Sequence, residues 1–433
     1  MAPGALPGFR DFYPAEFAER AHLFAAWRDV ARRFGFVEYD GPPLEPLELY
    51  TKKSGDEIVA QLYNFKDKGD REVALRPEMT PTFARMAAAR ANALRKPVRW
   101  FSIPQLFRYE RQQRGRLREH FQLNMDILGE PDVTADAELL AAAIEIMRAL
   151  GLTRADVVAR VSDRRLLNAL LKGGGYTEAQ LPAAYAALDK LARDPRPVLE
   201  ERLQQAGVAA PQIARLFDLA DSTADAAAFV GHVRRAGAEK EYAVMERYLE
   251  QLRALGVGDW VKLDLSIVRG LAYYTGIVFE LFDAKGELRA ICGGGRYDDL
   301  LEQLGGVAMP ALGFGMGDVV LGELLRDRQL MPVHAPTLDF WVAFADEVDV
   351  SHAMSVAGRL RARGKSVEYS LGAQKLARQL KAANAAGARH VVVLAPADLA
   401  RGEAVLKDMQ DGNEQRVTLD KWIDSLTSSG SNG

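Results

Sequence analysis

A dense group of arginines offers the clearest chemistry in this 433-residue chain. From Phe107 to Gly129 the sequence reads FRYERQQRGRLREHFQLNMDILG, and apolar and charged residues alternate on both sides of a turn at 113–116. This pattern predicts an antiparallel hairpin. Guanidinium groups bind phosphate oxygens, whereas carboxylate and amide oxygens accept hydrogen bonds from amines. The hairpin therefore suits a nucleotide beside a small zwitterion, and a solvated charged face is its alternative interpretation.

Spacing within the hairpin indicates which side chains act together. Residues an even number apart share one face of a strand, so Arg108 is grouped with Glu110, and Gln122 with Asp126. The hairpin is thus predicted to hold cations and hydrogen-bond acceptors on one surface.

Other stretches carry polar or small residues where strands end. Glu78 lies where an apolar strand, 73–76, breaks at a proline before a helix that begins near Thr80. Thr80 followed by proline is also a standard helix cap. Arg269 opens the stretch RGLAYYTG, and a triple glycine follows at 293–295. By themselves, these last two stretches indicate only a tight turn and a bulge.

Bulk composition narrows the class of protein. With 48% hydrophobic and 27% charged residues, the chain is predicted to be a soluble globular protein of two or three domains. It contains no apolar run long enough to span a membrane and no secretory signal pattern at its start, which predicts a cytoplasmic location. The single cysteine, Cys292, excludes internal disulfides, and no Cys/His cluster predicts a structural metal site. A net charge of −3 means that any RNA must be bound by local basic patches.

Several elements must position these groups. A helix is predicted from residues 11–14 to Gly35, with a stripe that includes Phe17, Leu23 and Trp27, followed by an extended segment at 36–39. Further helices are predicted at 134–151 and after 317, and strands at 157–161, 261–265 and 277–282. Residues 166–255 form an alanine-rich run of short helices. Beyond 337, strands alternate with helices, which predicts a small separate sheet.

The hairpin resembles motif 2 of class II aminoacyl-tRNA synthetases, and in detail that of histidyl-tRNA synthetases. The segment LRPEMT at 75–80, RGLAYYTG at 269–276 and ICGGGRYD at 291–298 resemble further motifs of that family. The first helix and strand, followed by Pro43, resemble motif 1. LGAQKLARQLKAANAAGARHVVVLAP, starting at residue 371, resembles the family's anticodon-binding domain.

This resemblance implies an α+β catalytic domain with an antiparallel sheet, a helical insertion and a C-terminal α/β anticodon-binding domain. The implied catalytic domain comprises 1–165, with motifs 1 and 2, and 256–330, with the histidine motifs and the motif 3 region. The insertion is 166–255, the anticodon-binding domain is 337–426, and 427–433 is a disordered tail.

The resemblance also implies the role of each site residue. Arg108 and Arg269 are implied to be catalytic, both on the α-phosphate. Histidine is implied to be bound by Glu78, Met79, Thr80, Gln122, Asp126, Tyr273, Tyr274, Gly294 and Tyr297. ATP is implied to be bound by Arg108, Glu110, Arg116, and His120 or Phe121 as the ring that stacks on adenine. The sequence departs from the family pattern at motif 3, where Val320 replaces the arginine that holds the γ-phosphate.

The activity implied is that of a histidine–tRNA ligase, which uses ATP with Mg²⁺ to form histidyl-adenylate and then charges tRNA(His). The implied partners are L-histidine, ATP, tRNA(His) and a second copy of the chain, with no membrane and no resident metal. Two other classes of protein are alternatives to a ligase. One is the catalytically inactive, histidine-sensing regulatory paralogue of ATP phosphoribosyltransferase, and the other is a nonenzymatic sensor of uncharged tRNA.

A basic surface is also predicted in the C-terminal region. This region carries seven cationic residues that are predicted to form a phosphate-binding face, namely Arg359, Arg361, Arg363, Lys365, Lys375, Arg378 and Lys381.

Overall fold

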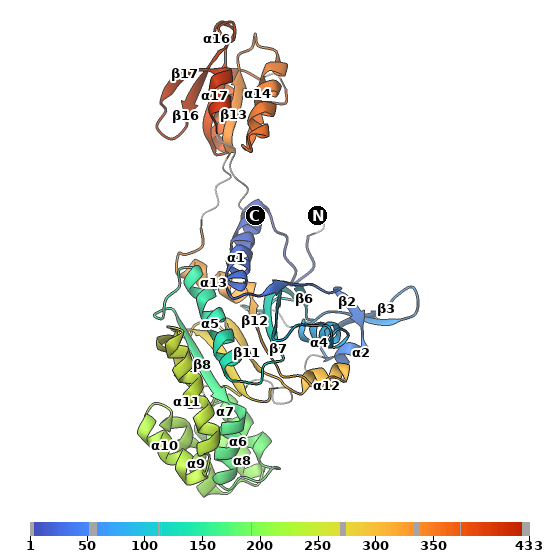
Figure 1. Cartoon of the computed structure of the whole chain (residues 1–433), viewed down its shortest axis with the longest axis vertical. Helices are drawn as coiled ribbons and strands as arrows, with labels where there is room; N and C mark the ends of the chain where they lie inside the picture. Colours follow the sequence, from blue (N-terminus) through green and yellow to red (C-terminus); the bar gives the residue numbers. More distant parts are fainter. Residues whose placement is uncertain are drawn as a thin grey trace. The chain divides into compact units, whose positions relative to one another are not determined.

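The computed structural model describes residues 4–51, 59–110, 113, 115–191, 193–268, 274–332, 338–372 and 374–426 (Figure 1). The chain divides into two compact units, Met1–Pro332 and Val333–Gly433. Each unit has hydrophobic clusters of its own. The expected tail at 427–433 lies outside the described residues. The expected division of the first unit into catalytic and insertion segments remains a prediction.

A nine-stranded, mainly antiparallel sheet forms the centre of the first unit, with the strand order β1-β5-β7-β12-β11-β10-β8-β9 and β6 paired to β7. This confirms the predicted fold class. Only the end pairs, β1 with β5 and β8 with β9, are parallel. The strands are β1 (Val37–Glu38), β5 (Val98–Ser102), β6 (Gln105–Phe107), β7 (Glu119–Leu128), β8 (Val157–Asp163), β9 (Val261–Leu263), β10 (Ile277–Asp283), β11 (Cys292–Arg296) and β12 (Ala311–Gly317).

The two faces of the sheet have different roles because side chains alternate along each strand. On β7, the residues Leu123, Met125 and Ile127 pack into the main hydrophobic cluster with α1 (Pro14–Arg33), α5 (Thr134–Ala149) and α13 (Asp318–Asp327). The intervening residues of β7 therefore point to the other face. That face carries the functional pocket described below.

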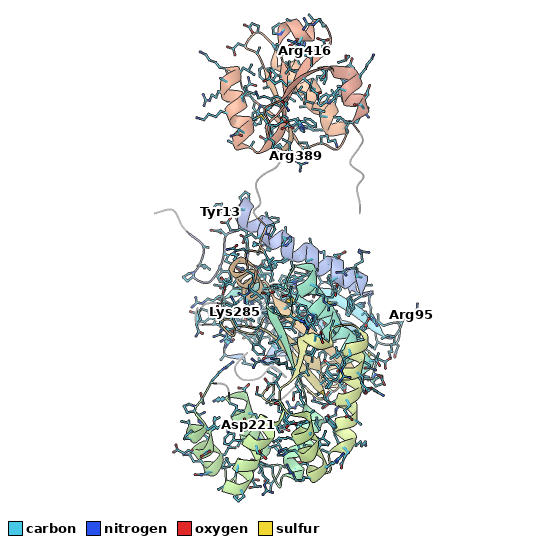
Figure 2. The ribbon with its side chains drawn as sticks, turned by 90° about the vertical axis from the view of Figure 1, so that its left-hand side faces the viewer. Tyr13, Arg95, Asp221, Lys285, Arg389 and Arg416 are labelled. Atoms are coloured by element: carbon cyan, nitrogen blue, oxygen red, sulfur yellow. The ribbon has the colours of Figure 1, made fainter. Side chains whose placement is uncertain are left out.

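The predicted first helix is present, but its apolar stripe is shorter than expected. Leu23, Trp27 and Val30 of α1 are buried, whereas Phe17 is 50% exposed. Figure 2 shows α1 from the side, with Tyr13 at its start. The first turn of α1 therefore extends beyond the core that its middle covers.

A small second sheet, which was predicted only in part, supports the start of α4 (Thr80–Ala88). It contains β2 (Leu44–Pro46), β4 (Glu72–Leu75) and β3 (Tyr63–Lys66), in that order, next to α2 (Glu48–Thr51). On its other side, α4 packs against α12 (Leu300–Gly305). Thr80 is the first residue of the helix rather than its cap, and Met79 occupies the N-cap position. The Thr80 side chain lines the pocket described below.

The alanine-rich segment folds into six helices among its described residues, all within the first unit (Figure 1). Leu181, Tyr185, Leu188, Met245 and Leu252 are buried there, as their spacing indicated. The helices are α6 (Arg164–Gly173), α7 (Leu181–Asp189), α8 (Arg196–Gln205), α9 (Ala210–Ser222), α10 (Ala226–Ala236) and α11 (Glu239–Ala254), followed by the short 3-10 helix Gly258–Trp260.

The second unit is a five-stranded sheet in the order β14-β13-β15-β16-β17. It confirms the predicted alternation and adds β17, which the sequence pattern did not indicate. The elements are β13 (Leu338–Phe344), α14 (Val350–Ala362), β14 (Val367–Tyr369), α15 (Leu376–Ala385), β15 (Ala388–Leu394), α16 (Pro396–Leu399), β16 (Glu403–Asp408), β17 (Glu414–Thr418) and α17 (Leu419–Ser425).

The seven predicted phosphate-binding residues do not share one face. Residues 340, 342 and 344 of β13 pack with α14 and α17, whereas 341 and 343 pack with α15. Therefore α14, with Arg359 and Arg361, and α15, with Arg378 and Lys381, cover opposite sides of the sheet. On α14, Arg359 is also paired with Asp420 at 2.6 Å.

Among the described residues, every helix is too short or too polar to cross a membrane.

Candidate active site

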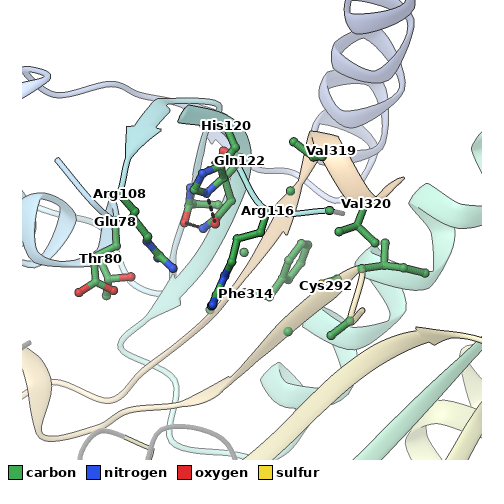
Figure 3. Close-up of a pocket in the computed structure, with 18 of the residues that line it drawn as sticks. Glu78, Thr80, Arg108, Arg116, His120, Gln122, Cys292, Phe314, Val319 and Val320 are labelled. Carbon is green, nitrogen blue, oxygen red and sulfur yellow. Dashed lines mark hydrogen bonds between the residues drawn. The ribbon is translucent and has the colours of Figure 1, made fainter. Parts of the chain in front are cut away.

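A cavity of about 290 Å³ opens on the face of the large sheet that the α1, α5 and α13 helices leave uncovered (Figure 3). Strands β7, β11 and β12 provide its floor, and the start of α4 and the loops on either side of the 113–116 turn provide its walls. Ten of the predicted site residues line it, namely Glu78, Thr80, Arg108, Glu110, Arg116, His120, Gln122, Asp126, Tyr274 and Tyr297. Tertiary structure thus brings together residues that are up to 219 positions apart in sequence (297 − 78).

Three predicted site residues do not line the cavity. Met79 is completely buried beneath it. Gly294 is paired with Phe314 of the neighbouring strand β12, and a Cβ atom on Gly294 would be 2.3 Å from the backbone oxygen of Gly313. Phe121 faces the opposite side of β7, where its ring centroid is 5.4 Å from that of Phe24. His120 is therefore the ring of the pair that reaches the pocket. Arg269 and Tyr273 lie outside the described residues.

A chain of hydrogen bonds orders the side chains along β7. The Nδ2 group of Asn124 donates to the backbone oxygen of Gln122 at 3.1 Å, which orients the Asn124 side-chain oxygen. That oxygen accepts from Nε2 of Gln122 at 2.9 Å. The remaining oxygen of the Gln122 amide lies 3.4 Å from Nε2 of His120. Gln122 therefore presents an acceptor to the pocket. Asn124, on the same face, was not singled out from the sequence, although its even spacing could have indicated it.

His120 is held in its neutral form. Burial lowers the pKa of His120 to about 3, and the positive charge of Arg108 acts in the same direction. In the neutral tautomer that carries its hydrogen on Nε2, His120 donates to the Gln122 oxygen. The ring is an uncharged planar surface at the pocket wall.

Asp126 of β7 lies at the floor of the cavity, next to Tyr297, the residue that follows β11. It is 4% exposed and accepts a hydrogen bond from the hydroxyl group of Tyr297. Burial raises the pKa of Asp126 to about 7, although the Tyr297 hydrogen bond opposes this rise. The carboxyl group is therefore close to half-ionised at neutral pH, and a bound cation would favour its charged form.

Glycines on β12 make room for these side chains. Gly313 is paired with Asp126 across the sheet, and a Cβ atom on Gly313 would be 2.0 Å from Oδ1 of Asp126. A Cβ atom on Gly315 would be 2.2 Å from Nε2 of Gln122. Side chains at either position would displace the polar groups. Neither glycine was predicted as a site residue, because the sequence alone does not reveal what packs over a glycine.

The first arm of the predicted hairpin ends earlier than expected. Strand β6 stops at Phe107, and the chain then turns, with the amide of Glu110 donating to the backbone oxygen of Arg108 at 2.8 Å. Both side chains still reach the cavity. Nε of Arg108 donates to the backbone oxygen of Pro77 at 2.9 Å, which links the hairpin to the turn before α4. Glu110 is buried and forms an ion pair with Arg116.

A buried ion cluster supports the pocket from behind. Nε of Arg10 donates to Glu119 at 2.6 Å, and its Nη1 is 2.9 Å from Asp318. Asp318 also accepts a hydrogen bond from the amide of Phe121 at 3.0 Å. The start of α13 is therefore tied to β7, two residues before Val320.

Figure 3 shows Arg108 and Arg116 turned toward the same space, with Glu78 and Thr80 to one side and Val320 to the other. Guanidinium groups, carboxylates and an amide acceptor in one cavity can hold a polyphosphate and an amino acid together. A pocket of this composition on a largely antiparallel sheet is what the resemblance to class II aminoacyl-tRNA synthetases implies.

Comparison with known proteins identifies the family. Residues 8–317 match the family described as histidyl-tRNA synthetase, and residues 333–429 match the anticodon binding domain. The chain therefore belongs to the histidyl-tRNA synthetase family.

Individual relatives match over most of the chain. The histidine–tRNA ligase of Opitutus terrae is 44% identical over 95% of this chain and 95% of its own length. The chloroplastic/mitochondrial histidine–tRNA ligase of Arabidopsis thaliana is 39% identical over 95% of this chain and 84% of its own. A crystal structure of histidyl-tRNA synthetase from Nostoc sp. is 25% identical, has a TM-score of 0.84 and covers 98% of this chain and 99% of that one.

Proposed function

We propose that the cavity is where this histidine–tRNA ligase joins the carboxylate of L-histidine to the α-phosphorus of ATP. The carboxylate oxygen attacks in line, the bond to the outer phosphates breaks, and histidyl-adenylate and pyrophosphate form. A terminal ribose hydroxyl of tRNA(His) then attacks the acyl carbon, and AMP leaves. The observation that carries the proposal is the single cavity that gathers Arg108, Arg116, Glu78, Gln122 and Asp126.

The histidine site is assigned to the floor and to the α4 side. Gln122 and Asp126 present oxygen acceptors that suit the α-ammonium group, together with Thr80 at the start of α4. Glu78, Tyr274 and Tyr297 line the cavity and suit an imidazole ring with its N–H groups. A pocket built to hydrogen-bond an N–H group rejects amino acids that lack it, because its buried polar groups would be left unpaired.

The ATP site is assigned to the hairpin side. Arg108 binds the α-phosphate, Glu110 faces the adenine amino group, and His120 stacks on the base. Arg116 binds the outer phosphates and must leave Glu110 when ATP enters. Arg269 is assigned to the α-phosphate by family resemblance. Catalysis then consists of positioning and of stabilising the charge that develops at phosphorus.

Mg²⁺ enters with ATP, whose phosphates and water supply most of its oxygen ligands. Among the described residues, no group of three or more histidine, cysteine or acidic side chains could hold a metal ion by itself. The carboxylates among the described lining residues, Glu78, Glu110 and Asp126, are already assigned to histidine and adenine, so phosphate oxygens and water would hold the ion.

Binding of tRNA is assigned to the second unit, and a cytoplasmic homodimer is part of the proposal. Exposed apolar side chains on α1, on the residue before it and on β1 support an interface there. Tyr13 is 69% exposed, Phe17 50% and Val37 62%. The match of the second unit to an anticodon binding domain supports a ligase over the regulatory paralogue.

Histidine-dependent exchange between ATP and labelled pyrophosphate tests this function. The wild-type protein should exchange only when L-histidine is present. Arg108→Ala should slow exchange more than about 100-fold, because it removes a cation from the transition state. Glu78→Ala should mainly raise the KM for histidine. Arg95→Ala, which removes an exposed arginine outside the cavity, is the matched control and should leave exchange unchanged (Figure 2). Absence of exchange in the wild type would contradict a ligase and favour the regulatory paralogue.

A further inference from the structure

One end of the cavity does not match the charge of the ligand proposed for it. Val319 and Val320 line that end, and the only lysine or arginine side chains among the described lining residues are Arg108 and Arg116. The outer phosphates of ATP carry most of the negative charge of the molecule and require cationic donors. A further cation near Val320 would provide them. This inference rests on the proposed function.

Arg289 lies at that end of the cavity. A Cβ atom on Gly115 would be 3.3 Å from Cγ2 of Val320 and 4.0 Å from Cδ of Arg289. The stem of Arg289, the backbone of Gly115 and the side chain of Val320 therefore meet at one place on the rim. The residues that follow Arg289 in the chain, Ala290 and Ile291, line the cavity itself.

The charge of Arg289 has no carboxylate to balance it within the described parts of the chain. Its guanidinium donates from Nη2 to the neutral amide oxygen of Gln113 at 2.5 Å. Two other arginines around the pocket are compensated, since Arg116 is paired with Glu110, and Arg10 with Glu119. A guanidinium has five N–H groups, so Arg289 retains donors for an anion. Its exposed position keeps them accessible.

The Gln113 contact connects Arg289 to a second phosphate ligand. The amide of Gln113 donates to the backbone oxygen of Arg116 at 3.2 Å, and the amide of Arg116 donates back at 2.9 Å. Arg289 therefore also holds the turn from which Arg116 extends. The Arg289 side chain can thus supply one positive charge and position a second, that of Arg116.

We propose that Arg289 binds the outer phosphates of ATP and supplies, from the connection between β10 and β11, the guanidinium that Val320 does not provide. Because AMP has no outer phosphates, this assignment predicts that loss of Arg289 affects ATP binding and not AMP binding. Arg289→Ala should raise the Kd for ATP by roughly 10-fold or more, which corresponds to the loss of a hydrogen bond to a charged group. The Kd for AMP should not change.

Calorimetric titration of the full-length protein with ATP and with AMP, at constant ionic strength, measures both constants. Arg289→Lys should keep part of the ATP affinity, because it retains the charge but not the planar fork. Lys285→Ala removes the same charge from an exposed position on the same connection and should change neither constant (Figure 2).

Equal losses of affinity for ATP and for AMP in the Arg289→Ala variant would overturn the assignment, and so would an unchanged Kd for ATP. The proposed function is checked separately by histidine-dependent exchange in the wild-type protein. Normal wild-type exchange with an unaffected Arg289→Ala variant would refute this inference alone. Failure of the wild type to bind ATP or to exchange would instead refute the proposed function.

Discussion

Asp126 illustrates how burial changes the chemistry of a single side chain. Burial raises its pKa to about 7, and Tyr297 limits the rise by donating a hydrogen bond. A raised carboxyl pKa contributes stability that is fully present below the unfolded value near 3.8 and is lost as the pH rises through about 7. Binding of an ammonium ligand has the opposite pH dependence, because the ligand binds the ionised carboxylate, which forms as the pH rises. Histidine binding and the stability of the free protein therefore respond to pH in opposite directions at this residue.

Tyr297→Phe should move the pH profile of histidine binding to higher pH. Removing the hydroxyl group removes a hydrogen bond that favours the carboxylate, so the pKa of Asp126 rises further. At pH 7 the variant should bind histidine roughly 5- to 50-fold more weakly than the wild type, and the difference should shrink toward pH 9. Calorimetric Kd values from pH 6 to 9 measure this. Titration of the ligand's own imidazole is common to both proteins, so parallel profiles would contradict the assigned role of the pair.

At the scale of elements, β12 shows that a strand can act through the side chains it lacks. Gly313 and Gly315 leave space for Asp126 and Gln122 of the neighbouring strand β7. The third glycine, Gly317, differs because a Cβ atom there would meet nothing within 4 Å. The strand therefore contains both a test position and its own control.

Gly315→Ala should weaken histidine binding by roughly 10-fold or more, because the new methyl group must displace the Gln122 amide that faces the ammonium group. Gly317→Ala should bind histidine as the wild type does. The KM for histidine in the exchange reaction gives the effect on binding, and the thermal unfolding midpoint checks that both variants are folded. A similar KM in the two variants would show that the space over Gly315 does not matter.

At the scale of the whole molecule, the proposed functions fall on two separate units. Unit Met1–Pro332 holds the cavity with every described residue of the assigned site. Unit Val333–Gly433 has its own sheet and hydrophobic clusters on both sides of it. Adenylate formation should therefore depend on the first unit alone, whereas tRNA binding should depend on both.

A protein truncated after Pro332 should keep histidine-dependent exchange within about threefold of the full-length rate, a change below 1 kcal/mol. Its charging of tRNA(His) at limiting tRNA should fall by roughly 100-fold or more, because two linked contacts bind more tightly than either alone. Parallel assays of exchange and aminoacylation test the division. Equal loss of both activities in a folded truncation would contradict it.

The sequence by itself determined the element types and the chemical character of the site. Alternation and helical spacing are local properties, so β7, α1, α5 and the βα pattern of the second unit could be recognised without coordinates. The residues quoted in the motifs also identified the family. Local patterns were less successful after Phe107, where a turn replaced the expected strand.

Only the tertiary structure decided which side of each element faces which partner. His120 and Phe121 are adjacent rings, and the packing of α1 against β7 turns Phe121 to the core and His120 to the pocket. The same kind of contact places α14 and α15 on opposite sides of the second sheet and sets Arg289 beside Val320. Long-range packing, which no local pattern records, is the physical reason for each of these outcomes.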